Sequence, residues 1–433
     1  MICSNISVNE KNHLCFAGFD TLDLAKEYGS PLYLYDEELI RQRCRLYNKA
    51  LSENFGEGSC ALYAGKAACF KYMYRIMAEE NMCVDLVSAG EIYTALKAGF
   101  PMERSFFHGS SKTDEELAFA IDSGVGCIVV DGFDELYALQ AIAAGKGVRQ
   151  RVLLRLTPGI DPHTYEAVAT GKVDSKFGVA IETGQAEEFV TEALKQRNII
   201  LEGYHCHVGS MVFDRDGTVY HDTAVIMLRF MHEMNEKYGM ALDVFNIGGG
   251  YAVRYTEDDP AIDIAGNIRA LAEFMKDYCG TLGMKLPKVL MEPGRSIVAD
   301  AGMTLYTVTA VKSIPGYKNY VSVDGGMTDN PRYALYGYEY TVYNASAVYG
   351  EDRLFCDLVG RCCESGDIVQ PDVTINRPGR GDLVAVCTTG AYNFSMASNY
   401  NRVPRLPVVM LSGGESRCVV RRETLEDLIE RDI

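Results

Sequence analysis

The stretch Ala61-Leu-Tyr-Ala-Gly-Lys66-Ala67 is a short apolar run that ends at a lysine preceded by a glycine. Such a run predicts a buried strand, and a lysine at the inner end of a buried strand is costly to hold as a free ammonium. A desolvated lysine amine is also the usual partner of an aldehyde in a Schiff base. The alternative is a lysine whose stem lies along apolar surface while its charge reaches solvent. The other residues that the fold brings to Lys66 decide between the two.

Short apolar strands alternate with helical stretches from Asp36 to about Pro293, as at Glu115 to Ser123 and Ala186 to Gln196. Eight strands are predicted: Ala61 to Ala64, Cys83 to Val87, Ser105 to His108, Cys127 to Val130, Val152 to Thr157, Tyr204 to Val208, Val244 to Ile247 and Val289 to Glu292. Eight βα units predict an α/β fold, a closed (β/α)8 TIM barrel over residues 37–295, with its active site at the C-terminal ends of the strands.

Polar and glycine residues concentrate at those predicted ends. They are Lys66, Asp85-Leu-Val-Ser-Ala-Gly90-Glu91, His108-Gly-Ser-Ser-Lys112, Asp131, Arg155, His205-Cys-His207-Val-Gly-Ser210, Gly248-Gly-Gly250 and Glu292-Pro-Gly-Arg295. This distribution favours an enzyme over a purely structural barrel.

Residues 296–433 change character to short alternating strands separated by Gly, Pro and Asp turns. Predicted strands are Leu305 to Val311, Tyr320 to Val323, Tyr338 to Tyr343, Leu383 to Cys387 and Arg417 to Arg421, and a helix is predicted over Glu423 to Ile433. Together with residues 1–36, which hold the short runs His13 to Ala17 and Pro31 to Tyr35, they predict an antiparallel β-domain.

The charge balance and cysteine pattern narrow the class of protein. Lys+Arg 42 against Asp+Glu 59 gives a formal net charge of -17, and no basic stripe is visible, so nucleic acid and anionic membranes are poor partners. The N-terminus lacks a basic, apolar leader and no apolar run is long enough for a membrane span, so a cytoplasmic protein is expected. The 14 cysteines contain no C-x-x-C pair and are expected to be reduced.

Gly248-Gly-Gly250 follows a predicted strand, so its bare amides suit a phosphate, although a tight turn has the same composition. Val253 occupies the last position of a would-be G-x-G-x-x-G motif, which argues against a dinucleotide enzyme.

His205 and His207 alternate on one predicted strand, so both side chains are expected on the same side of the sheet. They suit either a metal pair, as in barrel metallohydrolases, or one imidazole stacked on a flat ring. A metal hydrolase requires further His or Asp ligands at other strand ends, and His108 is the only other histidine there, so no metal site is predicted.

Glu292-Pro-Gly-Arg295 brings a carboxylate and a guanidinium to one strand end. The arginine suits two-pronged binding of a phosphate or carboxylate, and a glutamate can hold a pyridine nitrogen protonated, which makes that ring an electron sink. A structural ion pair is the alternative.

Taken together, these motifs resemble the pyridoxal-phosphate decarboxylases with an alanine-racemase-like barrel, and among them most closely the diaminopimelate decarboxylases. The resemblance runs from Gly29-Ser-Pro-Leu-Tyr-Leu-Tyr-Asp36 to Ser398-Asn-Tyr-Asn-Arg402. Its motifs are Tyr63-Ala-Gly-Lys-Ala67, His108-Gly-Ser-Ser-Lys112, His205-Cys-His-Val-Gly-Ser210, Glu292-Pro-Gly-Arg-Ser296, Arg332-Tyr-Ala-Leu-Tyr336 and Cys363-Glu-Ser365.

The resemblance implies a carboxy-lyase that uses pyridoxal 5'-phosphate to convert meso-2,6-diaminopimelate to L-lysine and CO₂, the last step of lysine biosynthesis. It leaves open another basic substrate: ornithine, lysine, arginine or carboxynorspermidine. A metal hydrolase using His205 and His207, and a cofactor-binding regulatory protein without turnover, are the rivals outside that reaction.

The resemblance also assigns roles. Lys66 is the Schiff-base lysine, His207 stacks on the cofactor ring and Cys363 is the proton donor. The cofactor is held by Asp85, Arg155, Ser210, Gly248, Gly249, Gly250, Glu292, Gly294, Arg295 and Tyr392, and the substrate by Arg295, Arg332, Tyr336, Glu364 and Tyr392. Cys363 and Glu364 reach the site from the partner subunit, so a homodimer with shared sites is implied, with the β-domain contributing to the pocket and the dimer interface. Met211 and Arg361-Cys362 depart from the family pattern near the expected rim of the pocket.

Overall fold

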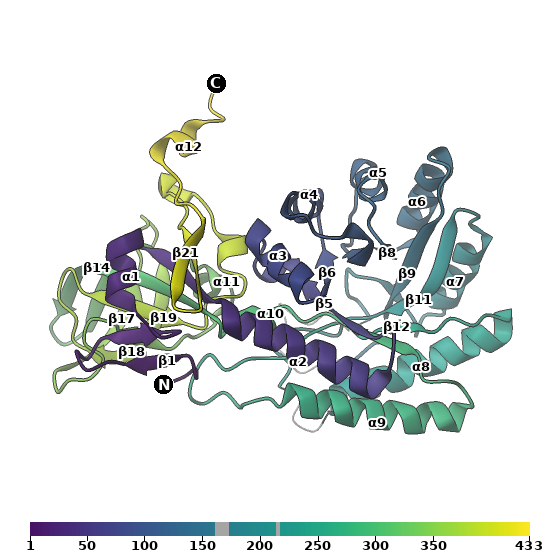
Figure 1. The fold of residues 1–433 in the computed structure, drawn as a ribbon, viewed down its shortest axis with the longest axis horizontal. Coiled ribbons are helices and arrows are strands. Elements are labelled where there is room, and N and C mark those ends of the chain that lie inside the picture. The colour runs from purple at the N-terminus through teal and green to yellow at the C-terminus, as the bar shows by residue number, and fades with distance from the viewer. Residues whose placement is uncertain (161–172, 214–216) are drawn as a thin grey trace. The chain divides into compact units, whose positions relative to one another are not determined.

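The computed structural model describes residues 1–160, 173–213 and 217–433 (Figure 1). The chain divides into two units. The β unit comprises Met1–Gln42, Val253–Ala261 and Arg295–Ile433, and the barrel unit comprises Arg43–Ala252 and Ile262–Gly294. Residues 37–42 and 253–261 therefore belong to the β unit, although they lie within the range 37–295 expected for the barrel.

The sheet of the barrel unit is closed and parallel. Its strands, in the order in which they pair, are β5 (Cys60–Ala64), β6 (Cys83–Leu86), β7 (Ser105–Phe107), β8 (Cys127–Val130), β9 (Gln150–Thr157), β11 (Ile199–His205), β12 (Val244–Asn246) and β13 (Lys288–Met291), which pairs with β5 again. A short strand, β10 (Val179–Ala180), adds to β9. The predicted (β/α)8 barrel is confirmed, because each strand is hydrogen-bonded to the next in chain order.

Helices follow the strands and lie outside them (Figure 1). They are α3 (Lys71–Glu79), α4 (Ala89–Ala98), α5 (Asp114–Asp122), α6 (Phe133–Gly145), α7 (Gln185–Lys195), α8 (Thr218–Tyr238) and α9 (Ile264–Leu282). Their starts are specified locally: Ser88 accepts a hydrogen bond from the Glu91 amide, and Thr113 with Glu116 forms a capping box. Such caps fix where each loop ends, and so position the loops at the strand ends.

Strand β11 begins and ends earlier than predicted. The expected range was Tyr204 to Val208, whereas the strand spans Ile199–His205. Its register against β9 shifts between Leu201 and Gly203, which interrupts the alternation of apolar residues. Because the strand ends at His205, His207 lies beyond it, and the expectation that His205 and His207 share one strand face is wrong.

The β unit is built on one open, mostly antiparallel sheet. In order of pairing its strands are β18 (Ile368–Asn376), β17 (Arg353–Val359), β15 (Lys318–Val323), β14 (Gly302–Ile314), β4 (Leu32–Asp36), β20 (Val408–Ser412) and β21 (Glu415–Val420), with β19 (Leu383–Cys387) joining β14 to β16 (Val342–Asn344). The pairs β15–β17 and β20–β4 are parallel. The N-terminal segment supplies β4 at the centre of this sheet, so residues 1–36 complete the β-domain core.

The N-terminal segment also supplies a three-stranded sheet, β1 (Ile6–Val8), β2 (Leu14–Phe16) and β3 (Phe19–Asp20), and helix α1 (Thr21–Tyr28). Leu14, Phe16 and Leu24 pack there with Leu305 and Val409 in one buried cluster. A longer helix, α2 (Glu37–Phe55), leads from this region into the barrel unit.

The predicted strand Tyr338 to Tyr343 is largely wrong. Only Val342–Asn344 is a strand, β16, and the tyrosines before it surround two arginines, as described below. Aromatic enrichment at Tyr338 and Tyr340 therefore reflects a site and not a strand. The predicted C-terminal helix is shorter than expected, because α12 spans Leu425–Ile429.

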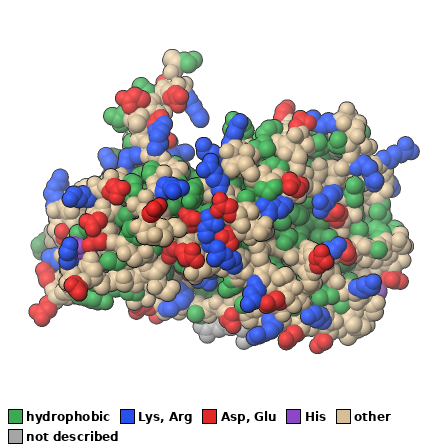
Figure 2. Space-filling model, in the orientation of Figure 1, with side chains coloured by type: hydrophobic (Ala, Val, Ile, Leu, Met, Phe, Trp, Pro, Cys, Tyr) green, Lys and Arg blue, Asp and Glu red, His purple; other side chains and the backbone are tan. Residues whose placement is uncertain are grey.

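Positive and negative side chains are interspersed over the face that Figure 2 shows. In the described parts of the chain, no helix has the length and apolarity that crossing a bilayer requires.

Candidate active site

Lys66 occupies the turn that follows β5. A Cβ at the preceding Gly65 would lie 2.4 Å from the hydroxyl of Tyr74, so the tight approach of this turn requires glycine. The Lys66 Nζ lies 3.8 Å from Oδ2 of Asp85, which ends the neighbouring strand β6. The lysine side chain is 44% exposed while Asp85 is 1% exposed, so the amine reaches the open end of the barrel and the carboxylate, not the lysine, is the buried charge.

Asp85 is a buried carboxylate that lacks hydrogen bonds. Neither carboxylate oxygen has a hydrogen-bond partner among the described residues. Burial raises the pKa of Asp85 to about 8, although the positive charge of Lys66 opposes this rise. A buried carboxylate without hydrogen bonds is energetically costly, so Asp85 suits a site that is completed by another cation or proton donor.

Glu292 is the centre of a buried polar cluster beneath the strand ends. The Asn246 side chain at the end of β12 donates a hydrogen bond of 2.7 Å to Oε1 of Glu292, and His205 Nε2 lies 3.1 Å from the same oxygen. His108 Nε2 lies 3.2 Å from it, and the His108 and His205 rings meet edge to face with centroids 5.0 Å apart. Burial disfavours ionisation, but His108 and His205 outweigh it and hold the pKa of Glu292 well below its usual range.

Burial lowers the pKa of both His108 and His205, although the negative charge of Glu292 opposes this change. With Glu292 they form a group whose ligand atoms lie within 4.8 Å of one another, which is close enough to hold a metal ion. This trio differs from the predicted pair, since His207 is not one of its members. Geometry alone therefore admits a metal site here as well as a carboxylate set to face a ring nitrogen.

The loop after β12 contains Gly248, Gly249 and Gly250, so it carries no side chains where it passes the end of β13. A Cβ would lie 2.6 Å from the Cys206 carbonyl at Gly248, 2.1 Å from the Glu292 carbonyl at Gly249 and 2.5 Å from the Gly209 carbonyl at Gly250. The last contact places Ser210, which follows Gly209, beside this glycine loop. Two amides of the loop donate hydrogen bonds within the protein, from Gly248 to Oδ1 of Asn246 at 2.9 Å and from Gly249 to His207, so glycine is required here by the close approach of backbone segments.

His207 is tied to the same loop. The Gly249 amide donates a hydrogen bond of 3.2 Å to Nδ1 of His207. Burial lowers the pKa of His207 to about 3, so the ring is neutral. A neutral ring held by the backbone suits stacking on a flat group better than it suits carrying a charge.

The remaining predicted barrel residues are also placed at the strand ends. Arg155 in β9 lies 3.8 Å from Asp131, and its guanidinium lies over the Phe177 ring. Gly294 follows β13, and a Cβ there would lie 3.0 Å from that of Ala64.

In the β unit, tyrosine rings enclose two buried arginines. Arg295 donates a hydrogen bond of 2.6 Å to the Tyr255 hydroxyl and lies 4.8 Å from the Tyr392 ring centroid. Arg332 lies 4.4 Å from Tyr338 and 5.1 Å from Tyr392. Tyr336 is a further neighbour of Arg332, at 5.4 Å.

Arg332 keeps unsatisfied donors in that cluster. It is 3% exposed, and its Nε and Nη2 have no hydrogen-bond partner among the described residues. None of those residues forms an ion pair with it through a carboxylate. A buried guanidinium with free donors and aromatic neighbours suits an incoming carboxylate.

Cys363 and Glu364 lie on a loop whose base is held by Asp367. This carboxylate accepts hydrogen bonds from the Cys362 amide at 2.7 Å and from the Met327 amide at 2.6 Å. The Cys363 amide donates a hydrogen bond of 2.7 Å to Asn401, and the Cys363 side chain is exposed. The loop is therefore anchored at its backbone while its thiol faces outward.

The comparisons with known proteins distinguish the two interpretations of the Glu292 cluster. A family described as "Pyridoxal-dependent decarboxylase, pyridoxal binding domain" matches residues 37–299. The chain is 42% identical to the diaminopimelate decarboxylase of Bacillus subtilis over 98% of this chain and 96% of that protein. It is 37% identical to that of Staphylococcus aureus over 99% of each.

The chain belongs to the diaminopimelate decarboxylase family. Among solved structures, the diaminopimelate decarboxylase of M. jannaschii in complex with L-lysine is 29% identical, with a TM-score of 0.91 over 100% of this chain and 98% of that one. The diaminopimelate decarboxylase of Helicobacter pylori complexed with L-lysine gives a TM-score of 0.84 at 31% identity.

This decarboxylase family uses pyridoxal phosphate, and the residues of the barrel unit fit that cofactor. The Lys66 amine suits its aldehyde, the ionised Glu292 suits a protonated pyridine nitrogen, and the glycine loop at Gly248 to Gly250 lies beside both Glu292 and His207. The unsatisfied carboxylate of Asp85 is consistent with a further positive partner.

Several residues of these clusters were missed by sequence reasoning. The only sequence signal for Asn246 was that it is the single polar residue of the predicted strand Val244 to Ile247. Tyr255 lies 40 residues before Arg295, Tyr338 follows Arg332 closely but fell within a predicted strand, and Asp367 looks like an ordinary turn residue. No local pattern marks these three as members of the clusters.

Proposed function

We propose that this decarboxylase converts meso-2,6-diaminopimelate to L-lysine and CO₂, releasing CO₂ from the D-configured centre. The observation that carries the proposal is the buried Arg332, whose guanidinium donors lack partners among the described residues. Relatives named diaminopimelate decarboxylase over nearly the whole chain support the same substrate.

Lys66 and Glu292 have complementary tasks in the barrel unit. The Lys66 amine, 3.8 Å from Asp85, would hold the cofactor through its aldehyde and would serve as a base once substrate had replaced it there. The ionised Glu292 would keep the pyridine nitrogen protonated. Pyridoxal phosphate, when bound, supplies a ring that accepts the charge left by departing CO₂.

The residues around these two groups fix the position of the ring. His207, neutral and tied to the Gly249 amide, would pack against the ring, and Asp85 with Arg155 would orient Lys66 and the ring. The phosphate would lie beside the loop at Gly248 to Gly250, and Ser210, Gly294, Arg295 and Tyr392 are its other expected neighbours.

The substrate is bound by the tyrosine-enclosed arginines. Arg295 and Arg332 bind carboxylate, with Tyr336, Tyr392 and Glu364 beside them. A planar guanidinium suits the distal carboxylate of diaminopimelate and repels the distal ammonium of ornithine or lysine. This contrast makes diaminopimelate the preferred substrate over the other basic amino acids.

The active enzyme is a homodimer with shared sites. Cys363 and Glu364 reach the active site of the partner subunit, and the Cys363 thiol protonates the carbon that has lost CO₂. The exposed thiol and the anchored loop beneath it support this arrangement. General acid catalysis of this kind contributes about a hundredfold to ten-thousandfold in rate.

The test is release of CO₂ from diaminopimelate, ornithine, lysine, arginine and carboxynorspermidine by the purified protein with pyridoxal phosphate. We expect diaminopimelate to be turned over fastest. We also expect the protein to be yellow, borohydride to bleach this colour, and the mass of the cofactor to be found on the Lys66 peptide after that treatment.

Faster turnover of ornithine than of diaminopimelate would overturn the substrate assignment. Bleaching with no CO₂ from any of them would indicate a binding protein, and bound zinc without the yellow colour would indicate a metal hydrolase at His108, His205 and Glu292.

A further inference from the structure

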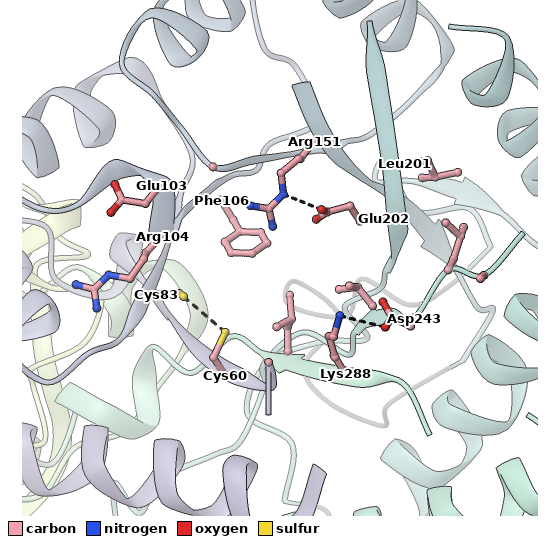
Figure 3. Close-up of a pocket in the computed structure, with 16 residues that line it drawn as sticks. Cys60, Cys83, Glu103, Arg104, Phe106, Arg151, Leu201, Glu202, Asp243 and Lys288 are labelled. Atoms are coloured by element: carbon pink, nitrogen blue, oxygen red, sulfur yellow. Dashed lines mark hydrogen bonds and ion pairs between the residues drawn. The ribbon is translucent and has the colours of Figure 1, made fainter. Parts of the chain in front are cut away.

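The end of the barrel opposite Lys66 contains a pocket of about 500 Å³ at the N-terminal ends of the strands (Figure 3). Cys60 opens β5 and Cys83 opens β6, and both line the pocket. Arg104, Arg151 and Glu202 are further lining residues. Nothing in the proposed decarboxylation uses this pocket, because the active sites of such barrels lie at the other end.

Cys60 and Cys83 face one another across two adjacent parallel strands. Leu62 is the register partner of Cys83, so Cys60 stands two residues earlier on the same face of the sheet. Their Sγ atoms are 3.5 Å apart, and Figure 3 shows the two sulfur atoms pointing toward each other. Both side chains are partly exposed, so a small molecule entering the pocket reaches them.

The surroundings make one thiol of the pair the better nucleophile. The pKa of Cys83 is lowered first by a hydrogen bond from the Cys60 thiol and further by the positive charges of Arg104 and Arg151, although burial opposes this. The same hydrogen bond and burial raise the pKa of Cys60. Arg151 is paired with Glu202 at 2.7 Å, whereas the Nε of Arg104 has no hydrogen-bond partner among the described residues.

Many other cysteines of the chain are less accessible than Cys60 and Cys83. Seven of them are buried: Cys15, Cys44, Cys127, Cys206, Cys279, Cys356 and Cys387. Burial raises the pKa of Cys127 and Cys206, which makes such thiols poor nucleophiles. Cys418 is exposed and donates to the Val420 carbonyl instead of facing a thiol.

We propose that Cys60 and Cys83 form a redox-active dithiol, a site at which hydroperoxides produce a reversible disulfide. The Cys83 thiolate attacks one peroxide oxygen, the O–O bond breaks, and the second oxygen leaves as hydroxide or alkoxide and takes a proton. The Cys60 sulfur then attacks the resulting sulfenic acid, the S–S bond forms, and the S–O bond breaks with loss of water. Overall, two thiols and one hydroperoxide give one disulfide, one alcohol or water from the peroxide, and one further water.

This step requires the sulfur separation to shrink from 3.5 Å to about 2.05 Å. Because Cys60 and Cys83 are offset by two residues in register, the strand ends must adjust as the side chains rotate about χ1. The disulfide would link β5 and β6, the strands that lead to Lys66 and Asp85. A dithiol reductant reverses it by exchange, which returns both cysteines to thiols.

The experiment treats the full-length holoenzyme with hydrogen peroxide, quenches with catalase, alkylates free thiols and maps peptides by mass spectrometry before and after reduction. We expect a Cys60–Cys83 linked peptide, a mass loss of two hydrogens per chain and full reversal by dithiothreitol. The experiment measures the oxidation state of the Cys60 and Cys83 thiols, so its outcome does not depend on the proposed decarboxylation.

Matched variants assign the roles of the two thiols. Cys60→Ser should stop disulfide formation and leave a sulfenic acid at Cys83 that dimedone traps, whereas Cys83→Ser should leave Cys60 a free thiol. Arg104→Gln should slow oxidation about threefold to tenfold, because the thiolate loses a neighbouring positive charge. Cys418→Ser is the control and should not change the yield. The proposal is overturned if wild-type Cys60 and Cys83 stay fully alkylated at a peroxide dose that oxidises Cys418, or if Cys60 oxidises equally fast in Cys83→Ser.

Discussion

Asp85 and Arg332 share one property, since each is buried with polar atoms that have no hydrogen-bond partner among the described residues. Leaving such an atom unpaired costs about 1–3 kcal/mol or more for a charged group. Both residues are therefore positions where a bound group contributes most to binding, and where a substitution is most informative.

Arg332→Lys should raise KM for diaminopimelate about tenfold to a hundredfold, because an ammonium cannot reproduce the two-pronged contact of a guanidinium with a carboxylate. Steady-state CO₂ release against substrate concentration measures the change. Arg380→Lys, an exposed arginine in the same unit, is the matched control and should leave KM unchanged. Equal KM values for the two variants would remove Arg332 from the substrate site.

Asp85 makes the stability of the cofactor-free protein depend on pH. Its pKa is about 8 when folded and about 3.8 when unfolded, so the folded chain binds the extra proton and its stability falls as pH rises from about 4 to 8. Asp85→Asn should remove that dependence. Thermal unfolding of the apo-protein should therefore show a larger stabilising effect of the substitution at pH 8 than at pH 5, and an equal or reversed effect would refute the assignment.

The chemistry-bearing residues at strand ends were largely predictable from the sequence. The carboxyl ends of parallel strands meet at one end of a barrel, so Lys66, Asp85 and Glu292 fall together once the strands are recognised. The partners of Glu292 were not all predictable, because β11 ends at His205 and Asn246 reaches Glu292 from another strand. Local patterns do not record which residues of neighbouring strands meet.

At the scale of elements, the loop after β12 shows how closely backbone segments approach one another. Gly249→Ala would place a Cβ 2.1 Å from the Glu292 carbonyl, so backbone must move. We expect a loss of about 1–3 kcal/mol in the free energy of unfolding and weaker binding of pyridoxal phosphate, measured by chemical denaturation and by cofactor titration.

Gly280→Ala is the control for that substitution. Gly280 lies in helix α9 with open space where a Cβ would stand, so alanine should stabilise the chain by about 0.5–1 kcal/mol without affecting cofactor affinity. If Gly249→Ala behaves like Gly280→Ala, the glycine loop has no role in binding the phosphate.

The loop that carries Cys363 depends on a single carboxylate. Asp367→Asn replaces one acceptor oxygen by an NH₂ group, which faces the amide of Cys362 or of Met327 instead of accepting from it. Lower kcat with a smaller change in KM is expected, together with a loss of about 1–3 kcal/mol in the free energy of unfolding. Asp372→Asn, an exposed aspartate of β18, should change neither quantity. Unchanged kcat in Asp367→Asn would show that the loop does not require this anchor.

Element prediction succeeded in the barrel unit and was weaker in the β unit for a physical reason. Buried parallel strands are continuous apolar runs, as in Cys127–Val130, whereas the strands of an open sheet alternate and bend. The β17, β18 and β20 strands were missed, and β18 contains Pro371 and breaks register with β17 near that residue. Sheet order, with β4 at its centre, depends on contacts between distant segments.

At the scale of the whole molecule, shared sites predict complementation between two inactive variants. Mixing a Lys66→Ala chain with a Cys363→Ala chain should restore about a quarter of wild-type activity, since random exchange makes half of the dimers mixed and each mixed dimer has one intact site. Mass spectrometry of intact dimers must show that exchange occurs. If mixing restores nothing, the sites are not shared, and if Cys363→Ala alone keeps full turnover, Cys363 is not the proton donor.

The two sheets of the molecule also differ in how they expose unpaired backbone. The parallel sheet closes on itself through the β13–β5 pair and has no free edge around the barrel, whereas the sheet of the β unit ends at β18 and β21. In the edge strand β18, Pro371 has no amide N–H and Asp372 adopts a positive φ. In the edge strand β21, Glu415 and Arg417 supply charged side chains. An interrupted ladder and charged side chains discourage another chain from adding a strand, so the feature that hid β18 from sequence prediction also protects the folded protein against edge-to-edge aggregation.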